Sequence, residues 1–203
     1  MPTFTKREIL AGLAAFAGAP AVAQTPAAPV RVVLTTALGA ITVELAADRA
    51  PITTANFLRY VDAKRFDGAA FYRAMKLRPA PPLGLIQGGL RGDAAKTFPP
   101  IAHESTRQTG LEHTAGTLSM ARYAPGTATS EFFICIGDIP SLDADPTAPG
   151  DNLGFAAFGH VVDGMENVLK ILAAPVSASG GDGAMRGQML DPTVAIVTAR
   201  RAS

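Results

Sequence analysis

The sequence has no tryptophan, and only one cysteine and three histidines occur among its 203 residues. A single cysteine, Cys135, excludes an intramolecular disulfide framework. It stands in an apolar segment, where a free cysteine behaves as a small hydrophobic residue, so we predict that it is buried in a strand. His103, His113 and His160 lack the spacing and the cysteine or glutamate partners of metal ligands. The sequence therefore indicates no metal site, and we expect no cofactor.

An excess of charge of either sign is also missing. Lys and Arg number 18 and Asp and Glu number 17; removing Lys6, Arg7 and Glu8 leaves 16 of each. A chain with this balance has no basic face that would attract a nucleic-acid backbone or an anionic membrane surface. Binding of nucleic acid is therefore not expected.

No apolar run reaches the ~20 residues that a membrane-spanning helix needs. Near the N-terminus, the basic pair Lys6-Arg7, the apolar run 9–17 and the small residues Ala21-Val22-Ala23 follow one another as in an export signal. We expect a signal peptide over residues 1–23, cleaved before Gln24, rather than a membrane anchor. The segment Thr5–Leu10 also resembles a twin-arginine signal with Lys in the first basic position, so both export routes stay open.

This interpretation divides the chain into a signal peptide (1–23), a flexible lead-in (24–29) and one domain (30–203), and it predicts a periplasmic location. Within the domain, 30–36 is rich in β-branched residues, 41–45 alternates, and a glycine stands between them, which predicts a hairpin. Two helices are expected, one beginning near Pro51 and one over Met165–Ala173.

Most of the remaining chain is typical of strands and loops. Further strands are expected at 71–73, 85–87, 117–121, 131–136, 153–162 and 192–199. The Pro-rich segment Met75–Leu83 is interpreted as a surface loop, 94–112 as an irregular connection, and 137–152 and 178–187 as loops. About eight strands and two helices, without alternating βαβ units, favour a mainly β fold. Closure into a barrel would remove exposed strand edges.

The stretch from Gly116 to Ile136, GTLSMARYAPGTATSEFFICI, contains the most informative pattern. Leu118 and Met120 alternate with smaller or polar residues, as in a half-buried strand. Pro125-Gly126 favours a turn, and the run 131–136 is apolar on both faces. The pattern predicts a hairpin with a long polar loop, and by itself it would indicate only two core strands.

The pair LSMAR and SEFFI resembles the central motif of the cyclophilins, the prolyl isomerases with a closed β-barrel. Other matching segments stand in the same order: Phe71-Tyr72-Arg73, Gln87-Gly88-Gly89, Phe155–Gly159 and Val162–Met165. The resemblance extends from about Val30 to about Arg200. It implies a closed eight-stranded antiparallel β-barrel capped by two α-helices, and peptidyl-prolyl cis-trans isomerase activity.

The chemistry of this reaction agrees with the residues available. Rotation about an X–Pro bond crosses a barrier of roughly 18–20 kcal/mol set by amide resonance, and no covalent bond is made or broken. Catalysis needs an apolar pocket for the proline ring and a fixed donor for the prolyl nitrogen, which regains its lone pair as the amide twists. An arginine suits this role because it is always protonated and presents a rigid fork of donors.

The resemblance assigns roles to particular positions. Arg73 matches the catalytic arginine, and Gln87 matches the glutamine that contacts the substrate backbone. The proline pocket is expected from Met120, Phe133 and Leu142, and the segment that pairs with the peptide from Ala121 and Arg122. Other expected substrate-binding positions depart from the family pattern: Tyr72 replaces a His, Leu85 follows Gly84 where the family has Phe-Met, Glu131 replaces a Gln, and Phe155 replaces a His or Tyr.

Two expectations follow from these departures. Without the pocket aromatic, cyclosporin-type ligands should bind more weakly than the family pattern implies. Glu131 should share its face of the strand with Phe133, where its carboxylate could pair with Arg73 or Arg122 and orient Arg73.

The implied partners are proline-containing segments of unfolded or exported proteins. Two alternatives remain. The first is a barrel that holds such segments with little turnover, as a chaperone or scaffold would. The second is a small-molecule barrel of lipocalin type, which the helix after the second strand and the long loops disfavour.

Overall fold

The computed structural model describes residues 29–202, so the expected signal peptide and most of the lead-in lie outside the described residues. The strands are β1 (Val30–Thr36), β2 (Gly39–Leu45), β3 (Ala69–Arg78), β4 (Leu83–Gly89), β5 (Thr117–Met120), β6 (Phe132–Ile136), β7 (Ala156–Asp163), β8 (Val176–Ser177) and β9 (Met189–Arg201). The helices are α1 (Pro51–Asp62), α2 (Thr106–Thr109) and α3 (Met165–Ala173), with 3-10 turns at Pro140–Leu142 and Gly183–Met185.

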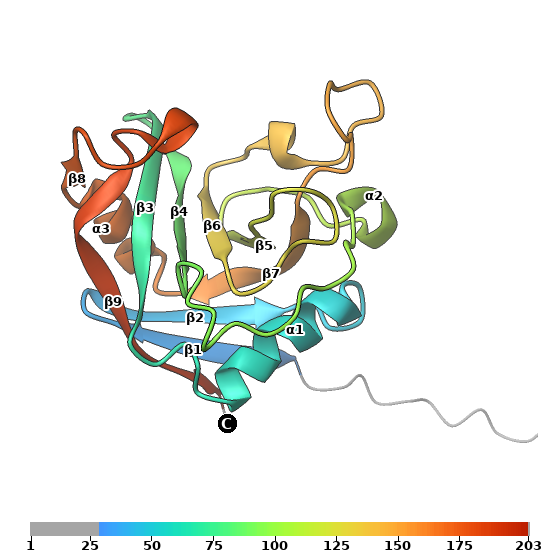
Figure 1. Ribbon diagram of the computed structural model, residues 1–203, viewed down its shortest axis with the longest axis horizontal. Coiled ribbons are helices and arrows are strands. Elements are labelled where there is room, and N and C mark those ends of the chain that lie inside the picture. The colour runs from blue at the N-terminus through green and yellow to red at the C-terminus, as the bar shows by residue number, and fades with distance from the viewer. Residues whose placement is uncertain (1–28, 203) are drawn as a thin grey trace, which may run out of the picture.

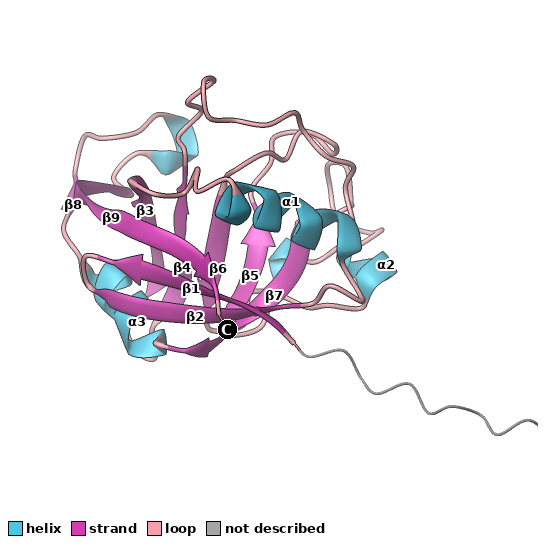
Figure 2. Ribbon diagram, turned by 90° about the horizontal axis from the view of Figure 1, so that it is seen from below, coloured by secondary structure: helices cyan, strands magenta, loops and turns pink. Residues whose placement is uncertain are grey.

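Eight of these strands close into a barrel. They are hydrogen-bonded in the order β1-β2-β7-β5-β6-β4-β3-β9, every pair is antiparallel, and β9 returns to pair with β1. The two-residue β8 pairs with β9 outside this ring. Figure 1 shows β3, β4 and β6 side by side, and α1 and α3 lie on different sides of the barrel in Figure 2. The predicted closed eight-stranded barrel is confirmed.

The helices complete the barrel core. Phe57 of α1 packs edge-on against Phe132 of β6, with ring centroids 5.4 Å apart, and lies 5.3 Å from Phe158 of β7. Val168 and Ile171 of α3 are fully buried in the same cluster. Both helices therefore bury their apolar faces against the inward residues of the strands.

The first helix begins where an external carboxylate caps it. Pro51 occupies the first turn. An amide N–H at this position has no partner within the helix, so its absence in proline costs no hydrogen bond. Glu104, from a loop far along the chain, accepts hydrogen bonds from the Thr53 backbone N–H at 2.7 Å and the Thr53 hydroxyl at 2.6 Å. A carboxylate at this end satisfies the free amides of the first turn and complements the helix dipole.

The Pro-rich segment Met75–Leu83 is only partly a loop, so that prediction was wrong over its first half. Strand β3 continues to Arg78, and its Met75 and Arg78 pair with Leu85 and Leu83 of β4. The prolines begin at Pro79, so the residues before them keep the amide hydrogens that the ladder needs.

Three further features differ from the sequence-based expectation. Strand β5 is buried on both faces, not one, because Ser119 is covered by His113. Strand β9 extends from Met189 to Arg201, beyond the predicted 192–199. The segment 94–112, expected to be irregular, contains the single turn α2. There the Ser105 N–H donates to Oε1 of Gln108 at 3.0 Å, which favours a helical start.

Candidate active site

A hollow of about 880 Å³ lies outside the barrel wall formed by β3, β4 and β6. Ten of the eleven predicted site residues line it: Tyr72, Arg73, Leu85, Gln87, Ala121, Arg122, Glu131, Phe133, Leu142 and Phe155. It is also lined by residues to which no site role was assigned, including Met75, Arg91 and several residues of 180–189. Residues from six separate stretches of the chain therefore meet at one surface.

Met120 is the exception. Its side chain is almost fully buried, belongs to the barrel core, and pairs in register with Phe132 of β6. Because side chains alternate along a strand, Ala121 faces the hollow while Met120 points to the opposite side. The expectation that Met120 forms a wall of the pocket is therefore corrected.

The apolar part of the hollow is a cluster separate from the barrel core. Leu85, Phe133, Cys135 and Ile139 form its buried centre. Around this centre pack Met75, Leu83, Ala121, Leu142 and Phe155. Phe155 meets the ring of Phe133 edge-on, with centroids 5.5 Å apart. Cys135 is fully buried in β6, as predicted, and burial raises the pKa of its thiol to about 12.

A buried polar group supports Phe133 from behind. The His113 ring stacks on Phe133 with centroids 5.8 Å apart, its Nδ1 lies 2.6 Å from Oδ1 of Asp143, and its Nε2 lies 2.9 Å from the Ser119 hydroxyl. Burial lowers the pKa of His113, although Asp143 acts to raise it. The three residues have the order of a hydrolytic triad, but Ser119 is fully buried, so no substrate can reach it. The hydrogen bonds to Asp143 and Ser119 fix the His113 ring against Phe133.

Arg73 is held on two sides by amide oxygens. Its Nη1 donates to Oε1 of Gln87 at 2.9 Å, and its Nε donates to Oε1 of Gln188 at 2.9 Å. Its Nη2 lies 3.6 Å from the sulfur of Met75. Burial lowers the pKa of Arg73, yet a guanidinium stays protonated in proteins. Gln188 was missed because it stands 115 residues away and carries no motif.

Glu131 faces this site but does not pair with either predicted arginine among the described contacts. Its Oε2 accepts a hydrogen bond from the Tyr72 hydroxyl at 2.6 Å, and its Oε1 accepts from Ser130 at 2.9 Å. Tyr72 in turn accepts from Nε2 of Gln87 at 2.8 Å. The expected direct pair with Arg73 is therefore wrong, because the Tyr72 phenol and the Gln87 amide stand between the two charges.

Arg122 also lines the hollow and is held by its own partners. Its Nη1 and Nη2 form a bidentate pair with Asp151 at 2.7 and 2.8 Å, and its Nε donates to the Gly154 carbonyl at 2.9 Å. Its guanidinium carbon lies 5.3 Å from the centre of the Phe155 ring. Hydrogen bonds from Arg122 lower the pKa of Asp151 to about 2. The pair fixes Arg122 beside the apolar cluster.

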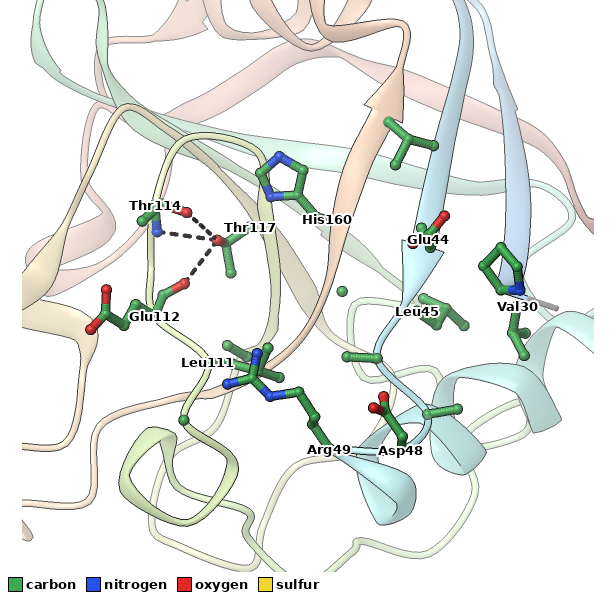
Figure 3. Close-up of a pocket in the computed structure, with 17 residues that line it drawn as sticks. Val30, Glu44, Leu45, Asp48, Arg49, Leu111, Glu112, Thr114, Thr117 and His160 are labelled. Carbon is green, nitrogen blue, oxygen red and sulfur yellow. Dashed lines mark hydrogen bonds between the residues drawn. The ribbon is translucent and has the colours of Figure 1, made fainter. Parts of the chain in front are cut away.

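A second hollow, of about 910 Å³, lies where β2 and β7 meet the segment 110–114 (Figure 3). The Thr117 hydroxyl there accepts from the Thr114 N–H at 3.1 Å and donates to the Glu112 carbonyl at 2.9 Å. It contains none of the predicted site residues.

Over residues 29–202, no cluster of His, Cys, Asp and Glu has the arrangement of a metal site. The same residues include no helix with the length and apolar character needed to cross a membrane.

The fold and the first hollow together define a class: closed antiparallel barrels with a hollow on the outer wall beside a fixed arginine. The chain belongs to the cyclophilins, because the family model described as cyclophilin type peptidyl-prolyl cis-trans isomerase/CLD matches residues 31–199. It is an enzyme of the peptidyl-prolyl cis-trans isomerase type. The family and the activity implied by the sequence are confirmed.

Individual relatives agree with this assignment. A peptidyl-prolyl cis-trans isomerase of Acinetobacter baylyi is 40% identical over 149 residues, which cover 71% of this chain and 73% of that protein. Peptidyl-prolyl cis-trans isomerase B of Escherichia coli is 36% identical over 149 residues, covering 70% and 84%. A crystal structure of a Cryptosporidium parvum cyclophilin type isomerase superposes with a TM-score of 0.69 at 21% identity, covering 87% and 99%, which supports the fold.

Proposed function

We propose that Arg73 is the donor to the prolyl nitrogen and that the cluster around Leu85 and Phe133 receives the proline ring. The observation that carries this proposal is the position of Arg73 at the edge of that cluster, with two of its N–H groups already held by Gln87 and Gln188. A donor fixed before substrate arrives needs no reorganisation as the prolyl nitrogen regains its lone pair. The transition state is then stabilised more than the planar amide.

The apolar cluster has the composition that a proline ring needs. Leu85, Phe133, Leu142 and Phe155 offer apolar surface, and Ala121 leaves space beside them. Burying an apolar side chain of this size is worth roughly 1.5–3 kcal/mol. Ala121 and the fixed Arg122 would hold the peptide on either side of the proline.

The proposed substrates are proline-containing segments of unfolded proteins that have been exported to the periplasm. The support is the order of charged, apolar and small residues before Gln24. Cyclosporin-type ligands are proposed to bind the same hollow, more weakly than in family members that carry an aromatic residue at the position of Gly84.

An isomerisation assay on the purified chain from Gln24 to Ser203 tests the proposal. The exchange rate of a peptide with one X–Pro bond is measured by NMR with wild type, with Arg73→Ala, and with Arg31→Ala as a matched control. Arg31 is an exposed arginine that pairs with Glu44 on the barrel surface. Loss of exchange with Arg73→Ala alone supports the donor role. Equal exchange in all three proteins contradicts it, and peptide binding without accelerated exchange would favour the alternative of a binding module.

A further inference from the structure

Arg73 and Glu131 are the two ends of a continuous chain of side-chain hydrogen bonds. From Arg73 Nη1 it passes to Gln87 Oε1 at 2.9 Å, from Gln87 Nε2 to the Tyr72 hydroxyl at 2.8 Å, and from that hydroxyl to Glu131 Oε2 at 2.6 Å. We infer that Tyr72 and Glu131 are positioning residues that impose one direction on this chain and thereby keep the Gln87 carbonyl facing Arg73. The inference rests on the donor role proposed for Arg73.

The direction follows from the chemistry of the two ends. A guanidinium can only donate hydrogen bonds, and a carboxylate can only accept them. Because Glu131 can only accept, the Tyr72 proton must point toward it, which leaves the phenol oxygen to accept from the Gln87 NH₂ group. The Gln87 carbonyl oxygen must then face Arg73. Both ends therefore favour the same order, and together they leave the reversed order without a hydrogen bond at either side of Gln87.

Reversing the Gln87 amide shows what this order prevents. The NH₂ group would then face the guanidinium, so two donors would be opposed, and the carbonyl oxygen would face a phenol whose proton is committed to Glu131. Both bonds of Gln87 would be lost. Gln87 and Tyr72 are largely buried, at 9% and 7% exposure, so water cannot readily replace the lost partners. Unsatisfied buried polar groups are strongly disfavoured.

The surroundings of Tyr72 keep its proton in place. Burial and the neighbouring Glu131 carboxylate raise the pKa of Tyr72, so the phenol remains a donor. The guanidinium of Arg91 lies over its ring, 5.5 Å from the centroid. The second oxygen of Glu131 accepts from Ser130, which fixes the carboxylate itself.

Gln188 provides a contrast on the other side of Arg73. Its Oε1 accepts from Arg73 Nε at 2.9 Å, and its Nε2 donates to the Ala184 backbone carbonyl at 2.8 Å. Its amide is therefore oriented by the main chain, whose carbonyl can only accept. The described side-chain bonds of Gln87 include none to a main-chain carbonyl. Its NH₂ group donates instead to the Tyr72 hydroxyl, whose own proton is held by Glu131.

Glu131→Gln is the sharpest test, because it keeps the size of the side chain and supplies both a donor and an acceptor. The Tyr72 proton can then turn toward Gln87, so a reversed Gln87 amide would lose only its bond with Arg73 instead of both of its bonds, and part of the population would present the NH₂ group to Arg73. We expect kcat to fall about three- to tenfold, the range of one misplaced hydrogen bond, with KM changed less than about twofold. Tyr72→Phe, which interrupts the chain, should lower kcat by a similar factor.

The experiment measures kcat and KM of the purified full chain for wild type, Glu131→Gln, Tyr72→Phe and both changes combined with Arg73→Ala. Glu44→Gln is the matched control, a carboxylate-to-amide change at the surface pair with Arg31. If Tyr72→Phe fails to fold, Glu131→Gln still decides the question. The side-chain amide resonances of Gln87, followed by NMR, report its orientation independently of turnover.

The expected result is a kcat effect of Glu131→Gln that disappears in the Arg73→Ala background, together with a shifted or doubled Gln87 amide signal. A wild-type kcat, an additive effect, or an unchanged Gln87 signal would overturn the inference. These outcomes are distinct from failure of the proposed function, in which Arg73→Ala itself would retain full activity.

Discussion

Arg73 and Gln87 are cross-strand partners in β3 and β4, and Nη1 of Arg73 donates to Oε1 of Gln87 at 2.9 Å. The register shifts in β3 between Phe71 and Arg73, in its pairing with both β4 and β9. An irregularity of this kind changes the direction in which a side chain leaves its strand. The main-chain pairing of two strands therefore places a donor and its amide partner on the same face of the barrel wall.

Replacing Arg73 should remove most turnover without unfolding the barrel. For Arg73→Ala we expect kcat/KM to fall about 10²–10³-fold, the usual effect of deleting one transition-state donor. Arg73→Lys should recover little, because one mobile ammonium group cannot reproduce the rigid fork of the guanidinium. Isomerisation kinetics and thermal melts of the three proteins provide the check. Wild-type kcat/KM in either variant with unchanged melting would contradict the role of Arg73.

Restoring an aromatic residue at Gly84 should fail. A Cβ atom at Gly84 would collide with the carbonyl oxygen of Met75 in the paired strand, so Gly84→Phe is expected to lower the melting temperature and weaken ligand binding. Leu85→Met, a volume-conserving change inside the apolar cluster, should leave the free energy of unfolding within about 1.5 kcal/mol of wild type. Thermal melts and titration with a cyclosporin-type ligand measure both effects. Tighter binding by Gly84→Phe would show that the strand pair can open to accept the ring.

The folded state should lose stability as the pH falls from about 7 toward 5. Burial lowers the pKa of His113 below that of the unfolded chain, near 6.5, so the unfolded state binds a proton that the folded state resists. The contribution is fully present above about pH 6.5 and declines below it. Denaturant unfolding at several pH values gives the free energy of unfolding as a function of pH. Between pH 7 and 5 this free energy should fall less steeply for His113→Gln than for wild type. His160→Gln is the control, since that ring is exposed. The same pH dependence of the unfolding free energy in all three proteins would contradict the role of His113 in the loss of stability at low pH.

Freeing Arg122 should affect substrate binding more than turnover. Asp151 holds its guanidinium with two hydrogen bonds at 2.7 and 2.8 Å, and Asp151→Asn would break the bidentate geometry. We expect KM to rise about two- to fivefold at low salt, as for a partly exposed ion pair, with little change in kcat. Added salt should reduce the difference. Asp62→Asn, which breaks an exposed pair with Arg201, is the control. A change confined to kcat would argue against this role.

Export should produce a mature chain that begins at Gln24. The basic, apolar and small segments of the first 23 residues have the order of a cleaved signal. N-terminal sequencing of the protein from the periplasmic fraction provides the measurement. Recovery of the chain with Met1 intact from the cytoplasm would rule out processing.

Local sequence determined most of the secondary structure. The helix predicted over Met165–Ala173 has those bounds in the structure, and the hairpin of the first two strands lies where the β-branched run, the glycine and the alternating run place it. Such elements depend on backbone torsion preferences and on side chains a few residues apart, which are visible in a single segment. The short motifs likewise located ten of the residues that line the hollow.

Tertiary structure decided which side chains meet. Alternation alone left open whether Met120 or Ala121 faces the hollow, because it gives the period of a strand and not which face is inward. Gln188 contacts Arg73 across 115 residues, and Tyr72 reaches Glu131 across 59. These contacts arise from closure of the barrel, which brings β3 between β4 and β9 and places the end of the β5–β6 loop beside it. The sequence alone therefore determined the strands, the helices and the type of chemistry, whereas the barrel register determined the partners that hold Arg73.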